Sequence, residues 1–129
     1  MRLVNEMRSD VTFLGYLDVN ELALCYNAAA AFAYPSLYEG FGLPPLEALA
    51  CGCPVVASNI PPLVEVCADA ACFVEPEHAE SIAEGLHKVL TDKDLRQALS
   101  RKGTARASRF SWEITAREML DIFEELEGA

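Results

Sequence analysis

Short apolar runs alternate with longer amphipathic segments along this chain, and that alternation limits its fold more than any other feature. The short runs predict strands over residues 11–15, 31–36, 54–58 and 71–76. The longer segments predict helices over residues 20–30, 43–52, 61–68, 78–90, 92–108 and 111–126. Strands that alternate with helices form a parallel sheet covered by helices. We therefore expect an α/β fold with a parallel sheet and flanking helices.

Polar residues mark where several of these helices begin. Asp18 or Asn20 is the expected cap of the first helix, and Ser111 that of the last. Trp112 starts an apolar stripe on the last helix, and we expect Trp112 and Phe110 to anchor that helix by packing.

Composition limits the class of protein and its partners. A chain of 129 residues makes one modest domain, and no apolar run reaches the roughly 20 residues that span a bilayer. The net charge of −10 would repel nucleic acid, so no nucleic-acid partner is expected. The polar start, MRLVNEMRSD, lacks the apolar segment of a secretory signal.

Five cysteines cannot all form pairs, and they lie in apolar or helical surroundings: Cys25, Cys51, Cys53, Cys67 and Cys72. Reduced thiols in the cytoplasm are therefore expected. The Cys51-x-Cys53 pair lacks the usual spacer of a metal site and has no second pair at a matching distance. We expect neither a metal site nor a cofactor.

The stretch SLYEGFGLPP follows the second predicted strand and leads into a helix. In parallel sheets, ligands bind beyond the carboxyl ends of the strands, which is where this loop lies. Gly40, Phe41, Gly42 and Leu43 each carry a backbone N–H at the positive end of the helix, whereas the two following prolines carry none. These four residues could bind an anion such as a phosphate. A plain helix start after a βα turn is the alternative.

Glutamates lie on both sides of this glycine loop. Glu47 could accept hydrogen bonds from a ribose diol, or it could simply be a charge near a helix start. Glu39 could accept hydrogen bonds from sugar hydroxyls or balance charge that develops at a reacting carbon, or it could be a solvated loop acid.

The stretch SLYEGFGLPPLEALACGCPVVAS resembles the signature of the glycosyl transferases group 1 family, a large retaining group with the two-domain GT-B fold. The match has Glu39, Gly40-Phe41-Gly42, a proline and Glu47, followed by the Ala-x-Ala-x-Gly-x-Pro-Val pattern. Similarity continues on both sides over nearly the whole chain.

The resemblance implies that residues 1–129 are a partial, Rossmann-like C-terminal domain that binds a nucleotide-sugar donor, a GDP- or UDP-hexose. Glu39 would be the catalytic residue near the donor sugar, and Glu47 would bind the ribose. The backbone of Gly40, Phe41, Gly42 and Leu43 would contact the phosphate or sugar. The function implied is mannosyl or glucosyl transfer that builds a polysaccharide or glycoconjugate, in the cytoplasm or at the inner face of the membrane.

Two parts of the family pattern are missing here: an N-terminal acceptor domain, and an upstream segment with two strands and a basic pair. Arg2 and Arg8 do not stand in the context of that pair. We therefore expect the chain alone to be inactive. In the family's sheet order, the two missing strands lie between the strand at Val11 and the strand at Ala31. Open strand edges would remain. A new pairing or association with another copy could close the gap, and we expect self-association.

Two other interpretations compete with that of an enzyme fragment. A non-catalytic nucleotide-binding or interaction domain with the same fold would have no need for both Glu39 and Glu47. A dinucleotide-dependent oxidoreductase domain is disfavoured because EGFGLPP lacks the Gly-x-Gly-x-x-Gly spacing.

Overall fold

A parallel three-stranded sheet forms the centre of the computed structural model, which describes residues 10–128. The strands are β1 (Phe32–Tyr34), β2 (Val55–Ser58) and β3 (Ala71–Val74), in the order β1-β2-β3. Phe32 pairs with Val55, which in turn pairs with Ala71. The three later predicted strands are therefore confirmed.

All six predicted helices are present, with a short 3-10 turn, η1 (Ala68–Ala70), before β3. They are α2 (Val19–Ala28), α3 (Leu43–Ala50), α4 (Pro61–Cys67), α5 (Ala79–Thr91), α6 (Lys93–Ala107) and α7 (Trp112–Glu127). The cap of α2 is Asp18 rather than Asn20, and its carboxylate accepts from the Glu21 amide at 2.9 Å. Ser111 caps α7 as expected, with its hydroxyl 3.1 Å from the Ile114 amide.

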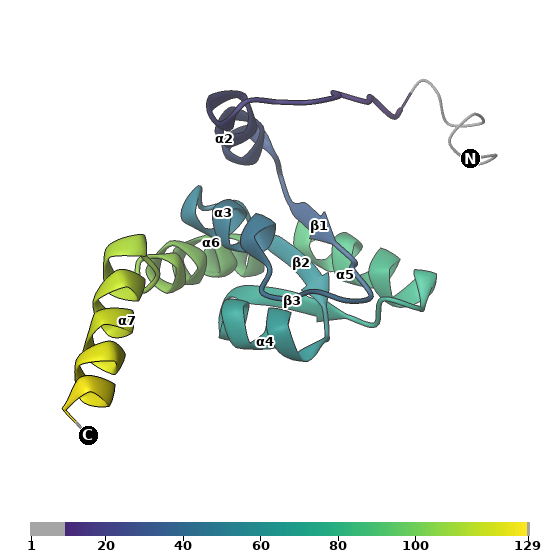
Figure 1. Ribbon diagram of the computed structural model, residues 1–129. Helices are drawn as coiled ribbons and strands as arrows, with labels where there is room; N and C mark the ends of the chain where they lie inside the picture. The colour runs from purple at the N-terminus through teal and green to yellow at the C-terminus, as the bar shows by residue number, and fades with distance from the viewer. Residues whose placement is uncertain (1–9, 129) are drawn as a thin grey trace.

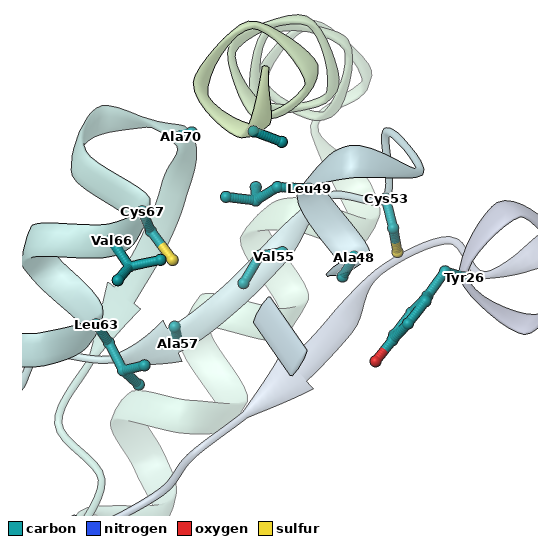
Figure 2. Close-up of a cluster of buried hydrophobic side chains, with 11 residues drawn as sticks. Tyr26, Ala48, Leu49, Cys53, Val55, Ala57, Leu63, Val66, Cys67 and Ala70 are labelled. Atoms are coloured by element: carbon teal, nitrogen blue, oxygen red, sulfur yellow. The ribbon is translucent and has the colours of Figure 1, made fainter. Parts of the chain in front are cut away.

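Helices cover both faces of the sheet (Figure 1). The side chains on the two faces of β2 belong to two separate hydrophobic cores. Val55 and Ala57 face α3 and α4, where Leu49, Leu63 and other apolar side chains pack (Figure 2). The alternate residue Val56 faces the other way, toward α5 and α6. Because β2 is buried on both faces, its first three residues, Val55, Val56 and Ala57, form a continuous apolar run.

One predicted strand is wrong. Residues 11–15 form no strand, and Phe13 and Leu14 are 80% and 60% exposed. A strand needs a neighbour for its N–H and C=O groups, and no strand between residues 10 and 128 lies beside this segment. The segment therefore does not pair again with the sheet, and the outer edge of β1 stays unpaired within the described residues.

The last helix also departs from expectation, because α7 buries none of its residues and projects away from the sheet (Figure 1). Trp112 is 76% exposed, so the prediction that it anchors the helix by packing is wrong. Phe110 does pack as expected. Its ring lies 6.0 Å from that of Phe41, and the Arg106 guanidinium carbon lies 4.9 Å from its centroid.

The first nine residues lie outside the described part of the chain. The structure therefore does not test the inferences drawn from Arg2, Arg8 and the polar start. Among the described residues, none of the helices combines the length and the apolar character needed to cross a bilayer.

Candidate functional site

The glycine loop runs from the end of β1 to the start of α3, as the sequence predicts. Gly42 is the N-cap of α3 and has no side chain to bond the free amides of the first turn. The first bond back to the cap comes from the Leu46 amide, 3.3 Å from the Gly42 carbonyl oxygen. Within residues 10–128, the N–H groups of the four loop residues from Gly40 to Leu43 donate to no other protein group. This end of α3 therefore offers unpaired donors at its positive pole.

The two loop glycines have different physical roles. Gly42 has a φ of 103°, in the left-handed region, and a Cβ there would lie 2.5 Å from Leu63 Cδ2. Its lack of a side chain is therefore required by the fold. A Cβ on Gly40 would meet nothing within 4 Å, so the space beside that backbone is open.

Glu39 lies in the same loop, half-buried. The Tyr34 hydroxyl, at the end of β1, donates to Glu39 Oε1 over 2.7 Å. That hydrogen bond, with a smaller contribution from the nearby Ser36 hydroxyl, holds the pKa of the Glu39 carboxyl below its usual range. A carboxylate in this setting remains ionised at neutral pH and acts as an acceptor.

Glu47 projects from α3 into an exposed position rather than into the packed interior. Its Oε2 atom accepts a hydrogen bond from the Tyr26 hydroxyl of α2 over 3.4 Å. Burial of the Tyr26 ring and the nearby charge of Glu47 raise the pKa of Tyr26 to about 12, so this hydroxyl keeps its proton.

The two glutamates are linked by a row of three aromatic rings. The rings of Tyr26 and Phe32 meet edge to face with centroids 5.1 Å apart, and the rings of Phe32 and Tyr34 stack at 5.8 Å. We call Tyr26, Phe32 and Tyr34 the aromatic row. Its two end members each donate a hydrogen bond to one of the predicted site carboxylates.

Sequence analysis missed the aromatic row as part of the site. The alternation of Phe32 and Tyr34 along β1 places both rings on one face, and that pattern was the available signal. Tyr26 is buried on α2, and its hydroxyl donates to Glu47, 21 residues further along the chain.

Two hollows adjoin the glycine loop. One, of about 290 Å³, is lined by Gly40, Phe41 and the first turns of α4, including Pro61 and Glu65. The other, of about 310 Å³, lies between α3 and the start of α7, and Glu47 and Phe41 are among its lining residues. Of the predicted site residues, Gly40 and Phe41 line the first hollow, and Phe41, Leu43 and Glu47 line the second, whereas Glu39 and Gly42 line neither of these two. Within residues 10–128, no cluster of three or more His, Cys, Asp or Glu side chains is arranged to hold a metal ion.

Comparison with known proteins identifies the fold and the family. The chain is 40% identical over 114 residues to O-antigen chain mannosyltransferase B of Escherichia coli. This match covers 88% of this chain and 30% of that protein. It is 38% identical over 119 residues to the serotype-specific mannosyltransferase WbdA of Escherichia coli, covering 92% of this chain and 15% of the relative. The chain thus spans less than a third of these relatives.

A solved structure, the sucrose-phosphate synthase from Thermosynechococcus elongatus, superimposes on 98% of the chain with a TM-score of 0.88 and 34% identity, using 33% of its own length. The expected Rossmann-like part of a GT-B fold is therefore confirmed. The family model described as "Glycosyl transferases group 1" matches residues 5–106, which include the whole glycine loop and both glutamates. The chain belongs to the glycosyl transferases group 1 family.

Proposed function

We propose that residues 1–129 form the donor-binding part of a retaining hexosyltransferase. The observation that carries this proposal is the row of unpaired amides from Gly40 to Leu43 within residues 10–128, flanked by two carboxylates that each accept a hydrogen bond from a tyrosine. Unpaired N–H groups at a helix start favour a diphosphate. Carboxylates suit the hydroxyls of a sugar and a ribose, because each of their two oxygens can accept hydrogen bonds.

In this proposal the N–H groups of Gly40, Phe41, Gly42 and Leu43 receive the diphosphate or sugar, Glu47 receives the ribose diol, and Glu39 faces the transferred sugar as the catalytic residue. Glu39 acts there as a fixed anion. Its lowered pKa makes it a poor proton donor, so it is better suited to balance positive charge at the anomeric carbon.

The reaction proposed is transfer on the face from which the diphosphate leaves. The bond between the anomeric carbon and the diphosphate oxygen breaks, and the acceptor oxygen bonds to the same carbon. The departing phosphate oxygen takes the proton of the acceptor hydroxyl, so the protein needs no separate base. The protein contributes by stabilising the negative charge on the departing diphosphate.

Mannose is the favoured sugar, because the two relatives described above are named mannosyltransferases. The donor would be GDP- or UDP-hexose, with glucosyl transfer as the second choice, and the product a polysaccharide or glycoconjugate. The proposed location is the cytoplasm, including the inner face of the membrane. Fractionation of cells that make the protein would test this location.

The acceptor would bind to an N-terminal domain that lies outside residues 1–129. The relatives described above are at least about three times longer than this chain, which leaves room for such a domain in them. We therefore propose that the isolated chain binds a donor but does not transfer the sugar. A turnover assay that detects a glycosylated acceptor with the isolated chain would contradict this.

A titration with nucleotide-sugars tests the donor site. We expect the chain to bind one of GDP-mannose, UDP-glucose and ADP-glucose selectively in an NMR titration that can follow millimolar affinities. Glu47→Gln should weaken that binding about 10-fold, because an amide loses the charge-assisted hydrogen bonds to the ribose diol. Glu84→Gln, an exposed change on α5, is the matched control and should leave the affinity unchanged.

The alternative is a non-catalytic nucleotide-binding or interaction domain with the same fold. Such a domain would bind the nucleotide, and the sugar would add nothing to its affinity. Equal affinities for GDP and GDP-mannose, unaffected by Glu39→Gln, would favour this alternative over the proposed transferase.

A further inference from the structure

The end of β1 carries a tyrosine whose hydroxyl contacts Glu39 directly. The donor–acceptor distance from Tyr34 Oη to Glu39 Oε1 is 2.7 Å, and the bond is partly buried. This distance is typical of a hydroxyl that donates to a carboxylate. Because Tyr34 is on a strand that pairs with β2, while Glu39 is in a loop, the hydrogen bond ties the loop acid to the sheet.

The Tyr34 ring is itself held in place by the aromatic row. It stacks on Phe32 with an interplanar angle of 26°, and Phe32 meets Tyr26 edge to face. Tyr34 also pairs with Ala57 of the fully buried strand β2 through its backbone. Because the ring is fixed in this way, its hydroxyl oxygen has one position, and the hydrogen bond from that hydroxyl determines where the carboxylate lies.

Tyr34 thus occupies Oε1 of the carboxylate, and among residues 10–128 no donor forms a hydrogen bond to Oε2. The Ser36 hydroxyl, on the same loop, donates to the Tyr38 carbonyl oxygen over 2.9 Å and contributes to the lowered pKa of Glu39. The carboxylate is therefore ionised and oriented before any ligand binds.

From this geometry we infer that Tyr34 is a positioning residue for the sugar site: it holds Glu39 Oε1 so that Oε2 faces the hexose of a bound nucleotide-sugar. The inference rests on the proposed function, since it takes Glu39 to face the sugar. Beyond the proposed function, it gives a role to Tyr34, which belongs neither to the glycine loop nor to the pair of glutamates.

The first test needs no ligand. Carbon-detected NMR of the 129-residue chain, labelled at the glutamate carboxyls, follows the Glu39 pKa in the native sequence and in two variants. Tyr34→Phe keeps the ring and its packing but removes the hydroxyl, so the Glu39 pKa should rise toward its ordinary value. Tyr38→Phe is the matched control, because it also removes one tyrosine hydroxyl, next to Glu39 in the sequence, from a side chain that is 88% exposed. It should leave the Glu39 pKa unchanged.

The second test separates positioning from a general structural role. Tyr34→Phe should weaken binding of the preferred nucleotide-sugar about 3- to 10-fold, as expected for one misplaced hydrogen-bond acceptor. Affinity for the corresponding nucleoside diphosphate, which lacks the sugar, should not change. A loss of affinity for both ligands, or for neither, would overturn the inference, as would a Glu39 pKa that does not move.

The outcomes also separate this inference from the proposed function. A native chain that binds neither nucleotide-sugar nor nucleoside diphosphate overturns the proposed function, and the inference with it. A native chain that prefers the nucleotide-sugar, together with a Tyr34→Phe variant that keeps this preference in full, overturns the inference alone.

Discussion

At the scale of single residues, the glycine loop depends on one position where a side chain cannot be accommodated. Gly42→Ala would put a Cβ 2.5 Å from Leu63 Cδ2 and force a non-glycine residue to a φ of 103°. The left-handed backbone alone costs about 1–2 kcal/mol, and displacement of a fully buried leucine adds to it. We expect a melting temperature lower by several degrees in calorimetry.

Gly40→Ala is the natural control for that experiment, because a Cβ there has no neighbour within 4 Å. Its melting temperature should match that of the native chain, while its affinity for the nucleotide-sugar should fall if ligand backbone contacts are made there. Equal destabilisation by both substitutions would contradict the distinction drawn between the two glycines.

At the scale of elements, most boundaries follow from local chemistry. Asp18 and Ser111 cap their helices by accepting hydrogen bonds from backbone amides within three residues, and Pro61 is the first residue of α4. The local sequence therefore suffices to predict where these helices begin. The strand expected at residues 11–15 fails for a non-local reason, since an apolar run becomes a strand only when another strand pairs with it. Sequence pattern cannot reveal whether that partner is present.

The same distinction applies to the site. Residues in the glycine loop are contiguous, so their position at the start of α3 follows from the turn and the prolines. The hydroxyl of Tyr26 meets Glu47 only because α2 and α3 pack together. Contacts of that kind depend on tertiary packing, which no local pattern encodes.

Arg106 of α6 holds the end of α4, and this contact gives a prediction about how the two helices depend on each other. Its Nε and Nη2 atoms donate to the carbonyl oxygens of Val66 and Glu65 over 2.8 and 2.7 Å. Those carbonyls belong to the last turn of α4, where a cation is favourable. Arg106→Lys keeps the charge but lacks the planar fork that reaches both oxygens.

We expect Arg106→Lys to lower the free energy of unfolding by about 1–3 kcal/mol, measured by urea denaturation. Arg101→Lys, on the same helix but exposed, should change it by less than about 0.5 kcal/mol. If Arg106→Lys proves as harmless as Arg101→Lys, the two hydrogen bonds do not stabilise the contact between the helices.

At the scale of the whole molecule, residues 10–128 leave apolar side chains exposed on the surface. The outer edge of β1 is unpaired within residues 10–128. On α7, apolar residues recur at the alternating three- and four-residue spacing of a helix–helix seam, interrupted once by Thr115: Trp112, Met119, Ile122 and Leu126, all more than half exposed. A second copy of the chain presents the same seam and could cover it.

We therefore predict that the isolated chain self-associates reversibly through α7. The net charge of −10 opposes association, so raising the salt concentration should screen the repulsion and increase the dimer fraction. Ile122→Glu combined with Leu126→Glu places like charges in the seam of both copies and should shift the chain to monomer, whereas Glu124→Gln, on the side of α7 away from the seam, should not. Sedimentation equilibrium at several protein and salt concentrations measures this. A monomeric mass for the native chain at the highest concentration and salt would refute the prediction.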